Sequence, residues 1–200
     1  MARREMSAFH RHRRSKLIIA NFSGFEADLL RSLAAQLVEL LRNEAAVPRD
    51  DRDPFEAMMD FSGPTSAPDD PVLARLFPAA YPDDEEASSE FRRFTEGTLR
   101  DGKAKAAITI IDGLEEAGLP PELTEEGLMI DVELDQPTAE TWMRSFTDLR
   151  LALATRLEVE DGDEAYWHSL PDDDPRSQAH DIYDWVGYLQ ETLVHALSSR

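Results

Sequence analysis

Apolar residues recur at helical spacing in four long stretches of the chain, separated by stretches rich in proline, glycine or acidic residues. The first stretch follows Ser23-Gly24-Phe25-Glu26, which fits a helix-capping box. It predicts an amphipathic helix whose apolar positions are Phe25, Leu29, Leu30, Leu33, Leu37, Leu40 and Leu41.

The second stretch begins after the acidic run from Asp83 to Glu86, which suits the positive end of a helix dipole. Asp101-Gly102 predicts a kink or a division within this helix, and the run from Gly118 to Pro121 ends it. The apolar positions that we expect to face the core are Phe91, Phe94, Leu99, Ile108, Ile111 and Leu114.

The third and fourth stretches predict two further helices. One begins between Asp135 and Thr138, and its apolar positions are Trp142, Phe146, Leu149, Leu153 and Leu157. The last helix has an apolar face made by Ile182, Trp185, Val186, Leu189, Leu193 and Leu197.

Two segments have the pattern typical of strands rather than helices. Residues Phe9 to Phe22 predict a hairpin that is interrupted at Arg14-Ser15. Residues Leu128 to Leu134 alternate between apolar and polar or flexible side chains, and we expect this strand to pair with the hairpin.

The connections between these elements are irregular. Residues 43–71 contain many prolines, and Asp53-Pro54 and Asp70-Pro71 each offer an N-cap followed by proline. They predict two short helices, one around Phe55 to Met59 and one around Val72 to Phe77. Residues 158–180 are acidic and contain proline, so we expect a loop there.

These patterns together predict a mostly helical α+β fold. It has four main amphipathic helices, additional short helices, and a small antiparallel sheet formed by the N-terminal hairpin and one later strand. The length of 200 residues, with 42% hydrophobic and 31% charged, suits a single domain over residues 1–200. That domain would include a basic N-terminal segment at 1–16 and the acidic loop at 158–180.

Charge is divided unevenly along the chain. The first sixteen residues hold six of the 21 Lys and Arg residues and one of the 41 Asp and Glu residues, so the remainder has 15 bases, 40 acids and a net charge of −25. Such a surface repels nucleic-acid phosphates, and we therefore expect a basic protein partner. Any contact with DNA would fall to the basic segment, at Arg11, Arg13, Arg14 and Lys16.

The sequence offers no support for an enzyme, a cofactor or a metal site. It contains no cysteine, which excludes disulfides, thiolate nucleophiles and cysteine-based zinc sites. No glycine-rich phosphate loop or zinc-protease motif occurs, and His10 and His12 lack a specified third metal ligand. No apolar stretch suits a signal peptide or a membrane span, so we expect a cytoplasmic protein that does not contact membranes.

Two aromatic residues, Tyr166 and Trp167, stand outside the helical patterns. They lie in the acidic loop, where they are candidates for an exposed contact with a partner. Burial beneath the loop is an equally good interpretation of the same pattern.

Asp148 and Arg150 interrupt an otherwise apolar helix. A buried arginine needs a carboxylate partner, because an unpaired charge in the interior is strongly destabilising. We therefore expect a structural ion pair between this helix and the last one, with Asp184 or Asp181 as the carboxylate.

Four segments resemble a known family. Residues Trp142 to Leu153 resemble its "W, then D-x-R-L-A-L" helix, and Tyr183 to Val194 match its Y-x-W-x-x-x-L-Q-x-x-L-V pattern. Residues Phe25 to Leu41 are similar to its first helix, and Asp70 to Pro78, followed by Tyr81, are similar to its D-P-x-L-x-R-L-x-P segment. The family comprises actinobacterial proteins first catalogued as a domain of unknown function and now described as AosR-type oxidative-stress transcriptional regulators.

The resemblance covers nearly the whole chain and implies a role in the transcriptional response to stress. Thiol–disulfide switching is not implied, because this chain has no cysteine. Combined with the charge distribution, the resemblance favours a regulator that acts mainly through protein–protein interaction, with RNA polymerase or a sigma factor as partner. The alternative is a non-enzymatic adaptor or assembly module in protein quality control. The patterns predict no particular oligomeric state.

Overall fold

The computed structural model describes residues 8–43, 63–123, 127–171 and 173–199, and it confirms the mostly helical class with a small antiparallel sheet. The four long helices are α1 (Gly24–Asn43), α4 (Glu85–Glu116), α5 (Gln136–Leu157) and α7 (Pro175–Ser198). The short helices are α3 (Pro71–Leu76) and α6 (Glu164–Trp167). The strands are β1 (His10–Arg11), β2 (Ile18–Ser23) and β3 (Met129–Leu134). The short helix predicted around Phe55 to Met59 lies outside the described residues.

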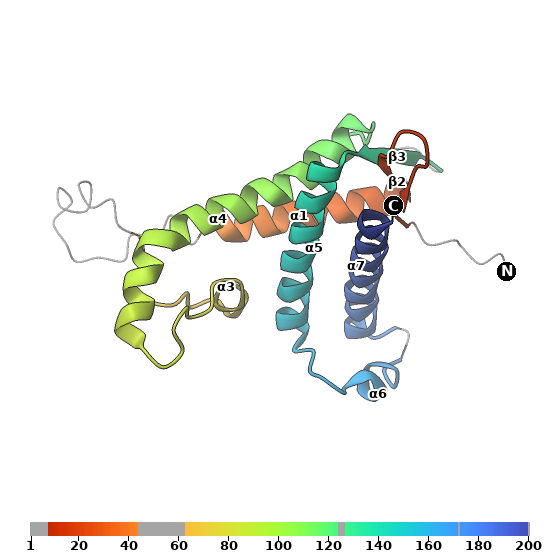
Figure 1. Ribbon diagram of the computed structural model, residues 1–200. Coiled ribbons are helices and arrows are strands. Elements are labelled where there is room, and N and C mark those ends of the chain that lie inside the picture. Colours follow the sequence, from red (N-terminus) through yellow and green to blue (C-terminus); the bar gives the residue numbers. More distant parts are fainter. Residues whose placement is uncertain (1–7, 44–62, 124–126, 172, 200) are drawn as a thin grey trace.

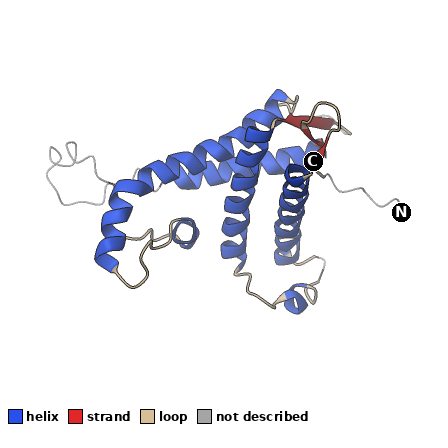
Figure 2. Cartoon of the chain, viewed as in Figure 1, coloured by secondary structure: helices blue, strands red, loops and turns tan. Residues whose placement is uncertain are grey.

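The long helices pack as two pairs, α1 with α4 and α5 with α7 (Figure 1). Helix α5 also contacts α4 and α3, so it links the two pairs. The sheet lies at one end of the α5–α7 pair and α6 at the other end (Figure 2). One connected cluster of buried apolar residues runs through the sheet and the long helices.

The sheet has the strand order β1-β2-β3, and both pairings are antiparallel. His10 lies opposite Ile19, and the second pairing runs from Ile18 opposite Leu134 to Ser23 opposite Met129. The predicted hairpin and its pairing with the later strand are therefore confirmed. Because side chains alternate across a strand, one face of the sheet packs on the core with Ile18, Ala20, Phe22, Ile130, Val132 and Leu134.

Helix starts follow the capping signals of the sequence. Ser23 and Glu26 form the predicted capping box, in which the Ser23 amide donates to Glu26 Oε2 at 2.8 Å. Four other helices begin at an aspartate whose carboxylate accepts backbone N–H groups of the first turn, namely Asp70, Asp84, Asp135 and Asp174. The last of these corrects the predicted loop at 158–180, because Asp174-Pro175 starts α7 and α6 lies within the same stretch.

The centre of the core is Trp142 on α5, which is fully buried. Its ring makes edge contacts with Phe9 and Phe146, at centroid distances of 6.1 and 6.2 Å. Its Nε1 donates to the carbonyl of Thr109 on α4 at 3.1 Å. Trp142 thus joins the N-terminal hairpin segment to both helix pairs.

Helix α4 differs from the prediction in its N-terminal half. It is one continuous helix through Asp101 and Gly102, although it bends within its N-terminal half (Figure 1). The side chains of Phe91, Phe94 and Leu99 were expected in the core, and they are 44, 68 and 48% exposed. The buried positions of this half are polar instead, at Ser88, Arg92, Glu96 and Arg100. Phe25 on α1, also expected in the core, is 68% exposed.

Gly113 on α4 provides a test of the packing around Trp142. A Cβ at this position would lie 2.8 Å from Cζ2 of the Trp142 ring, and the ring is fixed by its own burial. We predict that Gly113→Ala lowers the free energy of unfolding by about 1 to 3 kcal/mol because it overpacks the core. Urea denaturation measures the effect.

Gly97→Ala and Gly102→Ala are matched controls on the same helix. Among the described residues, and apart from the neighbouring backbone of α4 itself, no atom lies within 4 Å of a Cβ built at either position. Both substitutions are expected to raise the free energy of unfolding by up to about 1 kcal/mol, because alanine favours helix more than glycine does. Equal effects of all three substitutions would contradict the packing described here.

Candidate protein-interaction site

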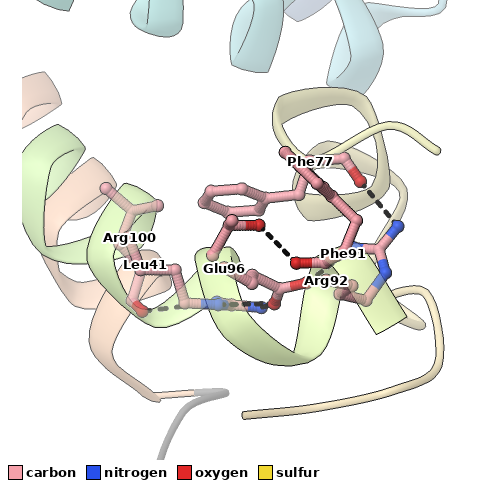
Figure 3. Close-up of polar contacts among 7 residues, drawn as sticks. Leu41, Phe77, Phe91, Arg92, Glu96 and Arg100 are labelled. Atoms are coloured by element: carbon pink, nitrogen blue, oxygen red, sulfur yellow. Dashed lines mark hydrogen bonds and ion pairs between the residues drawn. The ribbon is translucent and has the colours of Figure 1, made fainter. Parts of the chain in front are cut away.

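The most unusual feature of the structure is a buried charged triad on α4, formed by Arg92, Glu96 and Arg100. The residues are four apart, which places them on one face of the helix. Arg92 Nη1 donates to Glu96 Oε2 at 2.6 Å, and Arg100 Nε donates to Glu96 Oε1 at 2.8 Å (Figure 3). Glu96 is 2% exposed, and each arginine is 7% exposed. Both oxygens of one carboxylate are therefore used by two guanidinium groups.

The triad also ties α4 to two other parts of the chain. Arg92 Nη2 donates to the carbonyl of Phe77, just after α3, at 3.1 Å. Arg100 Nη1 donates to the carbonyl of Leu41, near the end of α1, at 3.4 Å (Figure 3). The Arg100 guanidinium also lies over the Phe77 ring, 4.8 Å from its centroid. Charged groups thus perform a packing role that apolar residues perform elsewhere on α4.

A groove lies directly beside the triad. It has a volume of about 250 Å³. We call it the α3–α4 groove, and its lining consists of Leu76, Phe77, Pro78, Ala79, Ala80, Ser88, Phe91, Arg92, Thr95, Glu96 and Leu99. The Tyr81 ring makes an edge contact with Phe91, at a centroid distance of 6.2 Å, and Tyr81 is 50% exposed. Exposed aromatic and aliphatic side chains therefore flank an apolar depression, as is common at protein interfaces.

Sequence reasoning missed this site because it assigned Phe91, Phe94 and Leu99 of α4 to the core. The spacing of Arg92, Glu96 and Arg100 was the available signal, since two opposite-charge pairs at four-residue intervals mark a polar helix face. On a helix with only one buried side, a polar stripe that faces inward forces its aromatic neighbours outward.

The predicted ion pair of Arg150 was wrong. Its Nη1 donates to Gln190 Oε1 at 3.1 Å and its Nη2 to the Tyr183 hydroxyl at 3.4 Å, and the guanidinium lies 5.3 Å from the centre of the Tyr183 ring. Asp184 instead lies 3.5 Å from Nδ1 of His180 and points largely to solvent.

The α7 face opposite Arg150 presents Gly187, where a Cβ would lie only 3.3 Å from Nε of Arg150. Glycine therefore allows the guanidinium to lie flat against the helix.

Asp148, which was expected to take part in the ion pair with the last helix, pairs with α4 instead. It accepts a hydrogen bond from Lys103 Nζ on α4 at 2.6 Å, and its side chain is 8% exposed. Burial raises the pKa of the Asp148 carboxyl above 3.8, although Lys103 acts in the opposite direction. The pair links α4 to α5 next to Phe77, whose ring centroid lies 5.9 Å from Nζ.

The four basic residues predicted to contact DNA have different environments. Arg11 is used within the fold, because its Nε and Nη2 donate to the carbonyls of Ala196 and Leu197 at 3.1 and 3.3 Å. It therefore caps the C-terminal end of α7. Arg13, Arg14 and Lys16 are exposed around the turn between β1 and β2, where Lys16 has a φ of 63°.

Tyr166 and Trp167 have opposite environments, although they are adjacent. Trp167 is 6% exposed, because its ring stacks on His180 at 4.5 Å and its Nε1 donates to Asp163 Oδ2 at 2.7 Å. The prediction of an exposed partner contact is therefore wrong for Trp167. Tyr166 is 46% exposed, and its hydroxyl accepts a hydrogen bond from Arg176 at 2.8 Å.

Comparison with known proteins places the chain in a family. Residues 6–197 match the profile described as a domain of unknown function, DUF2017. The chain belongs to this family. A relative from Mycobacterium leprae, a putative oxidative stress regulator AosR, is 32% identical over 186 residues, which are 86% of this chain and 78% of the relative. No solved structure matches.

The oxidative stress regulators AosR of Mycobacterium bovis and Mycobacterium tuberculosis are each 31% identical over 187 residues, with the same coverage. The resemblance inferred from the sequence is therefore confirmed, and the relatives are named as regulators rather than as enzymes. Within the part of the chain that the structure describes, none of the helices has the length and apolar character needed to cross a bilayer.

Lys103→Met tests the ion pair between α4 and α5. The substitution leaves the Asp148 carboxylate buried without its cation. We predict a loss of roughly 2 to 3 kcal/mol in the free energy of unfolding at pH 7. This loss is smaller than for a fully buried ion pair, because the Lys103 side chain is 25% exposed. The folded-state pKa of Asp148 lies above its unfolded value, so folding favours proton uptake there. The loss should therefore shrink as the pH falls through the folded-state pKa toward 3.8.

Urea denaturation across this pH range measures the effect, with Lys103→Met/Asp148→Asn as the control. The second substitution removes the buried charge, so the double variant should regain stability at pH 7 and lose the pH dependence that Asp148 causes. A loss in Lys103→Met that is independent of pH would show that the ion pair is not its source.

Proposed function

We propose that this chain is a transcription-associated regulator of the stress response that acts mainly by binding another protein, with RNA polymerase or a sigma factor as the partner. The observation that carries this proposal is the relationship over 86% of the chain to proteins named oxidative stress regulators. Two features of the chain support a protein partner in particular. One is the net charge of −25 beyond Lys16, and the other is the exposed apolar surface around the α3–α4 groove.

Acidic charge favours this kind of partner for a physical reason. Transcription proteins present basic surfaces that bind nucleic acid, and opposite potentials accelerate and orient association. DNA itself is a weaker candidate, because Arg11 is engaged with α7 and the exposed bases among the described residues of the basic segment are Arg13, Arg14 and Lys16. A small number of phosphate contacts gives a low affinity, which decreases further as the salt concentration rises.

Affinity purification of the full chain from stressed and unstressed cells, followed by mass spectrometry, tests the proposal. Nuclease treatment before capture removes partners that are held only through DNA. We expect polymerase subunits or a sigma factor to be enriched, and the enrichment to fall as the salt concentration rises, because the attraction is partly electrostatic. Recovery of chaperone or protease subunits alone would contradict the proposal and favour an adaptor in protein quality control.

A further inference from the structure

The exposed apolar residues of α4 are concentrated at the α3–α4 groove. Phe91 and Leu99 line it with 44 and 48% of their surfaces exposed, and Tyr81 extends the apolar rim next to Phe91. Phe77, which is 4% exposed, lies among the lining residues. The volume of about 250 Å³ is smaller than the 300 to 1,000 Å³ typical of small-molecule sites. The groove therefore suits one or two anchoring side chains of a larger partner.

The walls of the groove are held in place before any partner arrives. On one side, Arg92 binds the carbonyl of Phe77 and also Glu96. On the other side, the Ser88 hydroxyl donates to the carbonyl of Tyr81 at 2.7 Å and accepts from its amide at 3.0 Å. These contacts fasten the segment after α3 onto α4 at two points. A preformed groove binds with a smaller loss of conformational entropy than one that must be ordered.

The charge around the groove determines whether a basic or an acidic partner segment would bind there. The stretch from Leu76 to Phe91, which forms one wall and the beginning of the other, contains five acids and no base. All five are exposed, at Asp83, Asp84, Glu85, Glu86 and Glu90. The nearby guanidinium groups of Arg92 and Arg100 are buried and already bound to Glu96. Two exposed bases, Arg75 and Arg93, flank the stretch, so the five exposed acids remain in excess. An apolar depression with an acidic margin is complementary to a segment that is apolar on one side and basic on the other.

We propose that the α3–α4 groove binds a basic amphipathic helix of the partner protein. Its apolar face would contact Phe77, Phe91 and Leu99, and its lysines and arginines would lie against the acids of residues 83–90. The residues that line the groove belong to two helices and the segment after α3, which favours helix-in-groove binding over strand addition. This inference rests on the proposed function only in requiring that the partner is a protein.

Two exposed phenylalanines on the same helix make a matched test. Phe91 lines the groove, whereas Phe94, which is more exposed at 68%, does not. The probe is a fluorescent synthetic peptide of about 16 residues, with leucine at every third or fourth position and lysine or arginine between them. A second peptide replaces each base by glutamate. Fluorescence anisotropy with the full chain measures binding, and thermal melting confirms that both variants are folded.

The basic peptide should bind the unaltered chain and Phe94→Ser equally, and should bind Phe91→Ser at least about tenfold more weakly. The acidic peptide should not bind, and binding of the basic peptide should weaken when salt is raised from about 50 to 300 mM. Equal affinity for Phe91→Ser and Phe94→Ser, or binding of the acidic peptide, would overturn the proposal. So would a dimer in sedimentation analysis that Phe91→Ser converts to a monomer, because a second copy would then occupy the groove.

The two experiments distinguish failure of the groove proposal from failure of the proposed function. If Phe91→Ser still recovers polymerase or a sigma factor as efficiently as Phe94→Ser does, the regulator binds its partner through another surface and the groove proposal is wrong. If the peptide binds through Phe91 but affinity purification recovers chaperones or protease subunits, the groove proposal is right and the partner class is wrong.

Discussion

The carboxylate of Glu96 is the constraint on which the N-terminal half of the molecule depends. It is 2% exposed and forms ion pairs with two arginines that are themselves buried. Desolvating three charged groups is costly, and the cost is offset only when each group is paired and hydrogen-bonded. The three side chains of the triad meet this condition, because they bind one another and the two arginines also donate to the carbonyls of Phe77 and Leu41. The triad therefore holds α1 at Leu41 and the residue after α3, Phe77, against α4.

The triad also determines which residues face solvent. A helix that packs on one side has one inward face, and on the first half of α4 that face is polar. Phe91, Phe94 and Leu99 consequently lie outside the core, where they expose apolar surface on a strongly acidic protein. Aromatic side chains that leave apolar surface exposed to solvent are characteristic of binding sites. This chain contains no cysteine, so a thiol within it cannot act as a redox switch.

Local signals in the sequence predicted the elements well, because capping and strand alternation depend on neighbouring residues. The capping box at Ser23, the N-cap at Asp70 and the hairpin from Phe9 to Phe22 all formed as expected. Predictions that depended on tertiary contacts were less reliable. Periodicity could not show that the buried face of the first half of α4 is the polar one, because the contacts of Arg92 and Arg100 that bury this face are tertiary. Periodicity also could not show that Arg150 would bind Tyr183 and Gln190 on α7. Nor could it show that Trp167 would stack on His180.

Hydrogen–deuterium exchange of the full chain, alone and with purified RNA polymerase holoenzyme, tests the central claim most directly. Backbone amides that become buried or rigid on binding exchange more slowly, and peptide-level data locate them along the chain. If the partner binds at the α3–α4 groove, exchange should slow within residues 71–100, with little change in α7. An absence of protection anywhere, or protection confined to the β1–β2 turn or to α7, would contradict it.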